Sequence, residues 1–279
     1  MFSPDQYELL DFGAGRKLER FGQFVLDRAT PSAEDYQPVA PALWKSAHHR
    51  YLRDGGGWKY QHQQPPCWTV QHGPITFQLS PSEAGQVGLF PEQAPNWDWL
   101  AKQIAATESP CKVLNLFAYT GGSTLASAAA GAEVVHIDAA ASVVERARRN
   151  AELSGLADRP IRWIAEDAVK FVDRELRRGN RYDAVILDPP SYGHGTSGRA
   201  WKLAQDLPPL LEKLAELTAD HRAFLLLTCH TPGFDAAALA ALLKSTIGRG
   251  AIEHGALALQ ASTGRSLPSG HYARWTSRS

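Results

Sequence analysis

The sequence contains only three cysteines among its 279 residues, and no two of them lie close together in the chain. Cys67, Cys111 and Cys229 therefore lack the paired spacing of a structural zinc site, and three scattered cysteines do not make a disulfide framework. We expect neither a disulfide-stabilised fold nor a bound metal ion.

Long apolar runs are also missing. No stretch approaches the roughly 20 apolar residues that a membrane-spanning helix needs. The first residues, MFSPDQYELLD, show no basic region followed by an apolar core, which a secretory leader would have. Because 44% of the residues are hydrophobic, the chain can still bury a sizeable core. We therefore expect a soluble, cytoplasmic protein with no membrane partner.

Neither sign of charge predominates, since 29 basic residues balance 29 acidic ones. No overall positive field attracts nucleic acid, so RNA binding requires a local basic patch. Two segments are rich in arginine, and solvated helix faces are the simpler explanation for both. Their members are Arg146, Arg148 and Arg149 in one segment and Arg174, Arg177, Arg178 and Arg181 in the other.

Two nucleotide-binding fingerprints are absent from the most informative stretch, KVLNLFAYTGGSTLASAAAG, which runs from Lys112 to Gly131. Its glycines are adjacent, so the Gly-x-Gly-x-x-Gly spacing of dinucleotide-binding folds fails, and no Gly-Lys-Ser/Thr forms a P-loop. The stretch nevertheless predicts a buried strand, a tight turn at Gly121 and Gly122, and a helix capped by Ser123 or Thr124. A helix N-terminus after such a turn predicts a cofactor-binding site. With the dinucleotide and P-loop forms excluded, the form that binds S-adenosylmethionine remains.

Acidic residues follow the next predicted strands. EVVHID ends in Asp138, RWIAED ends in Glu166 and Asp167, and YDAVILD ends in Asp188. The carboxyl ends of parallel strands meet at one edge of a sheet, where open α/β sheets bind ligands. Asp138 is placed to accept hydrogen bonds from a ribose hydroxyl.

Strand and helix patterns alternate from residue 112 onward, which predicts a doubly wound, mostly parallel α/β sheet with a Rossmann-like fold. Asn96 is expected to cap a helix that runs to Ile104. Further helices are predicted over 123–130, 142–154, 168–178, 201–217 and 236–247, and the last two strands, 253–260 and 271–275, are expected to form a hairpin.

The segment from Tyr7 to about Ser80 is aromatic and rich in Gly and Pro, which predicts a small β-rich domain. We therefore divide the chain into an N-terminal domain with a linking helix, 1–108, and a catalytic domain, 109–279. Trp44, Trp58 and Trp68 are expected in the core of the small domain or at its contact with the larger domain; the alternative is a platform that stacks on an unpaired base.

The order of four motifs, NLFAYTGG, HID, AEDA and DPPSYG, resembles the class I S-adenosylmethionine-dependent methyltransferases. Within that class the chain is similar to the 23S ribosomal RNA large-subunit methyltransferases. VGLFPEQ resembles the segment before their catalytic domain, and LPSGHYARW resembles their closing hairpin. The resemblance implies S-adenosylmethionine as the cofactor and ribosomal RNA as the partner.

The same resemblance implies roles for particular residues. The turn, with its neighbours, holds the methionine part of the cofactor, Asp138 the ribose and Asp167 the adenine amino group. Gln93, after Glu92, lies near the amino-acid end of the cofactor, although Ala94 replaces the basic residue that often follows; a domain-joining loop is the alternative for this segment. The predicted cofactor-binding residues are Gln93, Asn115, Phe117, Tyr119, Thr120, Gly121, Asp138, Asp167 and Asp188.

The motif Asp188-Pro189-Pro190-Ser191-Tyr192 is the predicted catalytic segment. Its prolines fix an extended backbone, Asp188 is an acceptor for an incoming N–H, and Tyr192 can stack on an extruded base. The alternative is that Asp-Pro-Pro only ends a strand and has no catalytic role. The segment from His194 to Lys202, which includes Arg199, follows the motif and is a candidate to close over substrate or contact phosphate.

Cys229 ends the fifth predicted strand, where the 5-methylcytosine RNA methyltransferases that this chain resembles place a nucleophile. His230 would lower its pKa in that role. The other interpretation is a small buried core residue, in which case the methylated atom is a nitrogen.

Three functions remain open from the sequence. The first is methylation of a ribosomal RNA base; the second is methylation of a protein side chain or small molecule; the third is a cofactor-binding scaffold without catalysis. A nicotinamide-dependent dehydrogenase is disfavoured by the glycine spacing.

Overall fold

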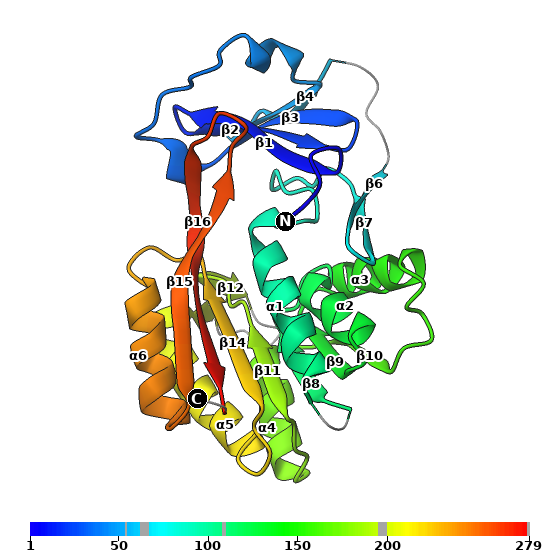
Figure 1. The fold of residues 1–279 in the computed structure, drawn as a ribbon, viewed down its shortest axis with the longest axis vertical. Helices are drawn as coiled ribbons and strands as arrows, with labels where there is room; N and C mark the ends of the chain where they lie inside the picture. The colour runs from blue at the N-terminus through cyan, green and yellow to red at the C-terminus, as the bar shows by residue number, and fades with distance from the viewer. Residues whose placement is uncertain (54, 62–66, 108–109, 195–199, 278–279) are drawn as a thin grey trace. The chain divides into compact units, whose positions relative to one another are not determined.

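The computed structural model describes residues 1–53, 55–61, 67–107, 110–194 and 200–277 (Figure 1). The chain forms two compact units, Met1–Pro95 with Ala258–Ser269 and Asn96–Leu257 with Gly270–Ser279. The division at residue 108 stays a prediction. In the structure most of helix α1 (Ala94–Ala105) belongs to the second unit, and the tip of the last hairpin belongs to the first.

The first unit contains a five-stranded sheet and a separate two-stranded one. The five strands are β1 (Tyr7–Gly13), β2 (Arg16–Phe21), β3 (Phe24–Ala29), β4 (His49–Leu52) and β5 (Gly57–Tyr60); the pair is β6 (Trp68–His72) and β7 (Ile75–Leu79). The first three strands form an antiparallel meander, and β4 runs parallel to β3. Phe12, Leu18 and Phe21 are fully buried, and because Leu18 and Phe21 are three positions apart on β2 they face opposite sides of the meander.

Hydrogen bonds or ring packing fix the three tryptophans of this unit. The indole of Trp44 donates to Asp11 at 2.8 Å, and that of Trp58 donates to the carbonyl of Ser82 at 2.8 Å. Trp68 is buried, and its ring lies 4.9 Å from the Phe24 ring. Each tryptophan therefore contributes to the packing of the small domain.

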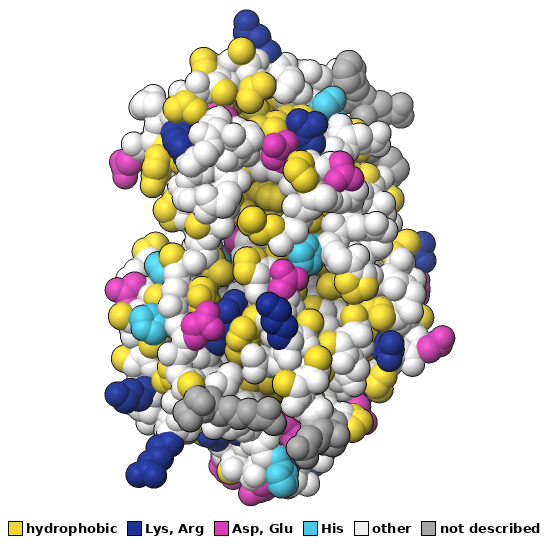
Figure 2. Space-filling view, in the orientation of Figure 1, with side chains coloured by type: hydrophobic (Ala, Val, Ile, Leu, Met, Phe, Trp, Pro, Cys, Tyr) yellow, Lys and Arg dark blue, Asp and Glu magenta, His cyan; other side chains and the backbone are white. Residues whose placement is uncertain are grey.

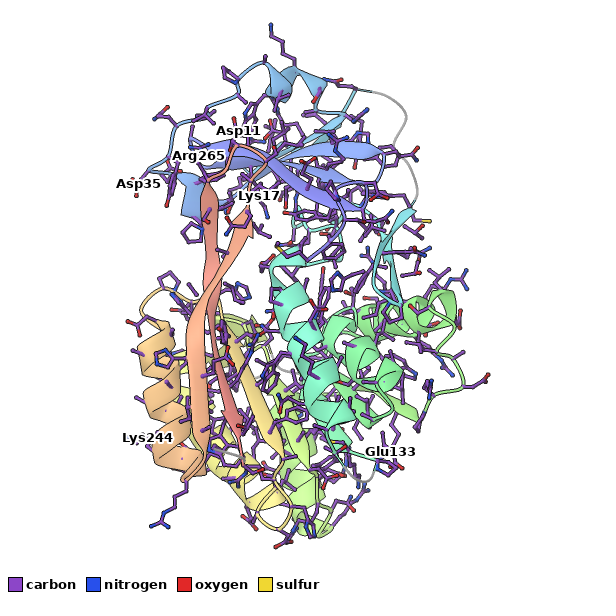
Figure 3. All side chains as sticks on the ribbon, viewed as in Figure 1. Asp11, Lys17, Asp35, Glu133, Lys244 and Arg265 are labelled. Atoms are coloured by element: carbon purple, nitrogen blue, oxygen red, sulfur yellow. The ribbon has the colours of Figure 1, made fainter. Side chains whose placement is uncertain are left out.

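Asp11 is completely buried and is also paired with Arg265 from the hairpin tip at 2.7 Å (Figure 3). The Arg265 guanidinium lies over the Phe12 ring, 4.3 Å from its centroid. A buried carboxylate requires such a partner, so Arg265 attaches the hairpin tip to β1.

The second unit contains a seven-stranded sheet in the order β10-β9-β8-β11-β14-β16-β15. The strands are β8 (Lys112–Leu116), β9 (Glu133–Asp138), β10 (Ile161–Ala165), β11 (Ala184–Leu187), β14 (Phe224–Cys229), β15 (Ala251–Gln260) and β16 (Ser266–Thr276). The first five in sheet order are parallel and β16 is antiparallel to β14. This order confirms the predicted doubly wound, mostly parallel sheet and the terminal hairpin.

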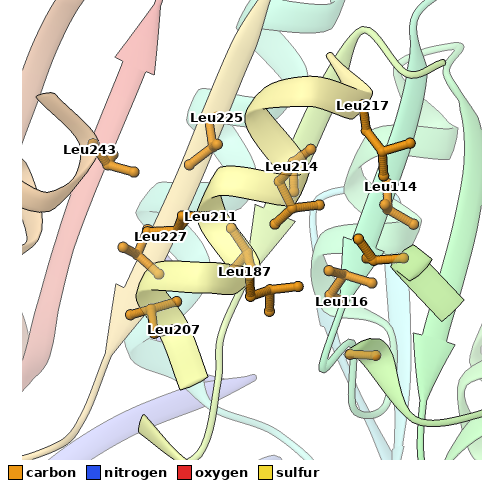
Figure 4. Packing of buried hydrophobic residues seen from close by; sticks show 14 of the residues in the cluster. Leu114, Leu116, Leu187, Leu207, Leu211, Leu214, Leu217, Leu225, Leu227 and Leu243 are labelled. Atoms are coloured by element: carbon orange, nitrogen blue, oxygen red, sulfur yellow. The ribbon is translucent and has the colours of Figure 1, made fainter. Parts of the chain in front are cut away.

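Helices cover both faces of this sheet (Figure 1). Besides α1 they are α2 (Gly122–Ala129), α3 (Ala141–Leu153), α4 (Ala168–Arg177), α5 (Leu203–Leu217) and α6 (Ala236–Ile247). Leucines of α5 and α6 pack on those of β8, β11 and β14 in one apolar cluster (Figure 4). Residues of α1 and α2 pack on the opposite face, so every central strand is buried on both sides.

Asn96 does not cap α1, contrary to the sequence-based expectation. The helix begins two residues earlier, at Ala94, and the Asn96 side chain accepts a 2.7 Å hydrogen bond from Arg274 Nη2 of β16. Arg274 is distant from Asn96 in the chain, so local capping rules could not predict this hydrogen bond.

None of the helices in the described part of the chain is both long enough and apolar enough to cross a membrane.

Candidate functional site

The turn that follows β8 has an unusual backbone. Phe117 and Tyr119 have φ values of 56° and 48°, and Gly121 has a φ of 90°. Side chains other than glycine rarely adopt this left-handed region, at a cost of about 1–3 kcal/mol for each residue. Such strain persists only where the surrounding structure imposes it and is most common at ligand sites, so the turn is a candidate site.

Glycine is required at two positions where this turn enters α2. A Cβ on Gly121 would lie 3.1 Å from the Ala147 Cβ, and one on Gly122 would lie 2.5 Å from the Trp97 ring. Gly121 occupies the N-cap position without a side-chain hydrogen bond. The expected caps, Ser123 and Thr124, were wrong, since the left-handed glycine itself begins the helix. The first amide groups of α2 therefore border the turn.

Below the turn, three buried polar side chains form a chain of hydrogen bonds. Asn115 Nδ2 donates to Thr124 Oγ1 at 2.8 Å, and Thr124 Oγ1 lies 2.9 Å from His136 Nδ1. Burial lowers the pKa of His136 to about 3, so this imidazole is neutral at physiological pH. Sequence reasoning missed Thr124 and His136 as a supporting pair, although a single Asn and a single His inside apolar strands indicated buried partners.

This network accounts for two of the predicted cofactor-binding residues. The side chains of Asn115 and Thr120 are both buried, and the Thr120 carbonyl accepts a 3.0 Å hydrogen bond from Asn150. In the structure Asn115 therefore belongs to the buried network under the turn, and Thr120, within the turn, is fixed by Asn150.

Asp138, at the carboxyl end of β9, connects to the turn. Its Oδ2 accepts a hydrogen bond from the Tyr119 amide at 2.9 Å, and its Oδ1 accepts one from the Ala140 amide at 3.0 Å. The side chain is half-buried. Each carboxylate oxygen can accept a further hydrogen bond, so the group is suited to a hydroxyl ligand.

The acidic pair after β10 has local partners. Asp167 caps α4 by accepting from the Lys170 amide at 3.0 Å, and Glu166 forms an ion pair with Arg174 at 2.6 Å. Asp167 retains acceptor capacity beyond its cap, which the predicted contact to an adenine amino group requires.

Asp188 follows β11 and is fixed by the neighbouring strand β14. Thr228 Oγ1 donates to Asp188 Oδ1 at 2.6 Å, and His230 Nε2 lies 3.6 Å from the same oxygen. Thr228 belongs to β14, which is parallel to β11, and His230 directly follows that strand, so the carboxyl ends of the two strands meet here. The geometry presents a half-buried, oriented carboxylate at the ligand edge of the sheet.

The two prolines and Ser191 are held in place by distant residues. Pro189 is buried, and the Pro190 carbonyl accepts a 2.7 Å hydrogen bond from the indole of Trp201. Ser191 Oγ lies 2.7 Å from Thr231 Oγ1, beyond β14. The segment is therefore attached to β14 and to β13 (Ala200–Lys202), and none of these partners was predicted from the sequence.

Two aromatic side chains flank this segment. Tyr192 begins the short strand β12 (Tyr192–His194), and 78% of its surface is exposed. The Phe117 ring of the strained turn lies 5.1 Å from that of Trp201. Through Trp201, Phe117 therefore connects the turn to the predicted catalytic segment, whereas the exposed Tyr192 ring is available to a ligand.

The Cys229 side chain lies on the side of β14 opposite to that of Thr228, which contacts Asp188. Its side chain is completely buried in the leucine cluster with Leu225 and Leu227, because alternate residues of a strand face the same side. Burial raises the pKa of the thiol. Both features disfavour a thiolate nucleophile. His230, which was predicted to lower the pKa of Cys229, lies next to Asp188 instead.

The remaining predicted positions belong to other segments of the chain. Gln93 is a buried residue of the 3₁₀ turn Pro91–Gln93 in the first unit. Arg199 lies outside the described residues, as does most of the segment 194–202. Of the arginine-rich segments, Arg149 pairs with Glu152 at 2.7 Å, as expected of a solvated helix face.

A cavity of about 410 Å³ in the second unit is distinct from this site. Trp99, Phe224 and Arg274 line it. Phe224 begins β14, whereas Asp188 and Thr228 lie near the carboxyl ends of their strands, so this cavity belongs to the other edge of the sheet.

The carboxyl edge fits a nucleoside cofactor that carries an amino acid. It combines a glycine turn without Cβ atoms, a helix N-terminus and a ribose-suited carboxylate after the second strand. Together with the seven-stranded order, these features define a class I S-adenosylmethionine-dependent methyltransferase.

Comparison with known proteins agrees. The chain belongs to the S-adenosylmethionine-dependent methyltransferase family, whose model matches residues 40–252. The structure is similar to that of the S-adenosylmethionine-dependent methyltransferase from Agrobacterium tumefaciens, with a TM-score of 0.92 and 34% identity over 98% of this chain and 91% of that one. The fold is also shared with SMU.776, solved with S-adenosylhomocysteine, with a TM-score of 0.78 and 15% identity over 98% of this chain and 76% of that one.

Curated relatives match more locally. Ribosomal RNA large subunit methyltransferase I of Aeromonas salmonicida is 33% identical over 108 residues, which make up 38% of this chain and 26% of that protein. The chain thus spans about a quarter of that relative's length.

Proposed function

We propose that this methyltransferase modifies a base of ribosomal RNA, and that the methylated atom is an exocyclic amino nitrogen. The observation that carries the proposal is the oriented carboxylate of Asp188, followed four residues later in the same segment by the exposed ring of Tyr192. A carboxylate accepts a hydrogen bond from an amino group, and an exposed aromatic ring stacks on a base taken out of its helix.

Catalysis of this reaction consists mainly of alignment. S-adenosylmethionine supplies a methyl group on a sulfonium, which is already a good leaving group. The turn 117–121 and Asp138 bind this cofactor, and Asp167 accepts from its adenine amino group. Asp188 accepts one N–H of the target nitrogen, so that the nitrogen lone pair is directed at the methyl carbon. Thr228 fixes the Asp188 carboxylate, and Tyr192 holds the base plane.

The state of Cys229 supports a nitrogen over a carbon target. Methylation at carbon 5 of a pyrimidine needs a nucleophile that attacks the ring. The only cysteine near the described catalytic segment is buried on the far side of β14, and its pKa is raised. An amino nitrogen has its own lone pair and needs no such nucleophile.

The RNA substrate is supported by the ribosomal RNA methyltransferases among the relatives. The charge distribution favours the second candidate, a small molecule or protein substrate. Lys and Arg side chains are dispersed among acidic and neutral groups on the face that Figure 2 shows, and the net charge is zero. The intact Asp188-Pro189-Pro190 segment argues against a scaffold without catalysis.

The proposal is tested with methyl-labelled cofactor and three substrate fractions: deproteinised ribosomal RNA, intact ribosomal subunits and an RNA-free extract. We expect label in an RNA fraction with the unmodified protein and at least 100-fold less with Asp188→Ala. Asp183→Ala is the matched control, since Asp183 lies at the opposite end of β11 and accepts from the Lys112 amide. Label confined to the RNA-free extract would overturn the RNA substrate, and no label anywhere would support the scaffold.

A further inference from the structure

We infer that His230 receives, through Asp188, the proton that the target nitrogen loses on methylation. The inference rests on the proposed function and assigns a further residue to the same site. His230 was expected to act on Cys229, and the geometry points to a different partner.

The order of residues along β14 determines which side chains face Asp188. Cys229 faces the leucine cluster, so its neighbour Thr228 extends to the other side of the strand, and His230 is the first residue after the strand. Both approach the same oxygen of Asp188, Thr228 at 2.6 Å and His230 Nε2 at 3.6 Å. Thr228 is buried and neutral, whereas His230 has 38% of its side-chain surface exposed. Only the histidine can both accept a proton and release it to water.

The opposite edge of the imidazole lies against a glycine of the last strand. A Cβ on Gly270 of β16 would lie 2.8 Å from His230 Nδ1 and 2.7 Å from the Cys229 carbonyl oxygen. Gly270 also has a φ of 118°, which disfavours any other residue. The hairpin therefore leaves space for the ring in the orientation that turns Nε2 toward Asp188.

The chemistry requires a proton acceptor at this point. When the nitrogen forms its bond to the methyl carbon, the carbon–sulfur bond breaks and sulfur keeps the electron pair. The nitrogen then carries a positive charge and must lose one proton. Asp188 is already hydrogen-bonded to that N–H, and His230 Nε2 takes up the proton that Asp188 passes on. The exposed imidazole then releases the proton to water. A contact of 3.6 Å in the absence of substrate commonly shortens in the reacting complex.

The first test compares His230→Gln with His271→Gln, a matched change one residue from Gly270 on β16. With RNA and labelled cofactor, we expect kcat to fall about 100-fold in His230→Gln with KM changed less than threefold, because general base catalysis contributes about that much. Binding of S-adenosylhomocysteine should remain unchanged, and His271→Gln should behave like the unmodified protein. Equal kcat values for all three proteins would overturn the inference.

Chemical rescue separates proton transfer from packing. The His230→Ala variant leaves a ring-sized space beside Gly270, which a set of imidazoles of equal size and different basicity can fill. Rescue that rises with basicity supports the inference. Rescue that is equal for every member of the set, or absent for all, overturns it, because a packing role depends on size alone.

A measurement without turnover keeps this inference separate from the proposed function. If the unmodified protein labels no RNA, the proposed substrate is wrong. The ring ¹⁵N chemical shifts of His230 still show whether His230 interacts with Asp188. We expect the Nε2 shift of His230, assigned by its loss in His230→Gln, to move in Asp188→Asn and to stay constant in His271→Gln. An unchanged shift in Asp188→Asn would overturn the inference whatever the substrate is.

Discussion

The backbone N–H of Tyr119 donates a 2.9 Å hydrogen bond to Asp138 Oδ2, which joins a strained turn to the end of the neighbouring strand. Tyr119 has a left-handed backbone conformation, and its hydrogen bond to the Asp138 carboxylate offsets part of the free-energy cost of that conformation. The residue proposed to bind the ribose therefore also shapes the turn proposed to bind the methionine part.

Asp138→Ala should weaken S-adenosylhomocysteine binding by at least 10-fold in titration calorimetry. The variant loses an acceptor for the ribose and the anchor of Tyr119, and hydrogen bonds to a charged group contribute about 1.5–3 kcal/mol each. Glu133→Ala, at the exposed start of the same strand, is the control and should bind normally. Unchanged affinity in Asp138→Ala would show that the ribose assignment is wrong.

Gly122→Ala should lower the free energy of unfolding by about 1–3 kcal/mol in urea titrations, although alanine is normally the better helix residue. The added Cβ would lie 2.5 Å from the Trp97 ring. In a Trp97→Phe background the same substitution should cost less, because the smaller ring makes room. Additive effects of the two changes would contradict the steric explanation.

Local patterns were sufficient for the sheet and most helices. The sequence predicts a helix over 236–247, and α6 has those bounds because Asp235 caps it through the Ala238 amide at 2.8 Å and Gly248 ends it. The buried strands β8, β9, β11 and β14 were equally clear, since apolar residues predominate in each of them. The short strands β4, β5, β12 and β13 were not predicted, because three or four residues carry too little periodicity.

The candidate site could be located from the sequence where it depends on strand ends, and not where it depends on partners far apart in the chain. Asp138 and Asp188 follow directly from the positions at which two apolar strands end. The contacts of Asp188 with Thr228 and of Ser191 with Thr231 span about 40 residues and arise only when β11 and β14 pair. No local rule connects such residues.

Cys229→Ala should retain methyl transfer within about threefold of the unmodified protein. The thiol is completely buried among leucines and its pKa is raised, so little thiolate is available for attack. Initial rates with labelled cofactor test this directly. Loss of more than 100-fold in activity, together with a covalent adduct between the unmodified protein and RNA, would restore Cys229 as the nucleophile.

Stability should fall with decreasing pH because of His136. Its imidazole ionises near pH 6.5 when unfolded, whereas burial lowers its pKa to about 3 in the folded protein. Between these values the unfolded state binds the additional proton, so stability is lost as the pH falls from 6.5 toward 3, by up to about 1.4 kcal/mol per pH unit. His136→Asn should be less stable at pH 7 and show a shallower dependence below pH 6. Parallel curves for the two proteins in urea unfolding would contradict this.

The central claim, transfer of a methyl group to an amino nitrogen of ribosomal RNA presented by Asp188, is tested most directly by identifying the product. Ribosomal RNA labelled by the purified protein is digested to nucleosides and analysed by mass spectrometry. The account predicts a single nucleoside methylated on its exocyclic nitrogen, absent when Asp188→Ala replaces the unmodified protein. A 5-methylpyrimidine, or a product formed equally well by Asp188→Ala, would contradict it.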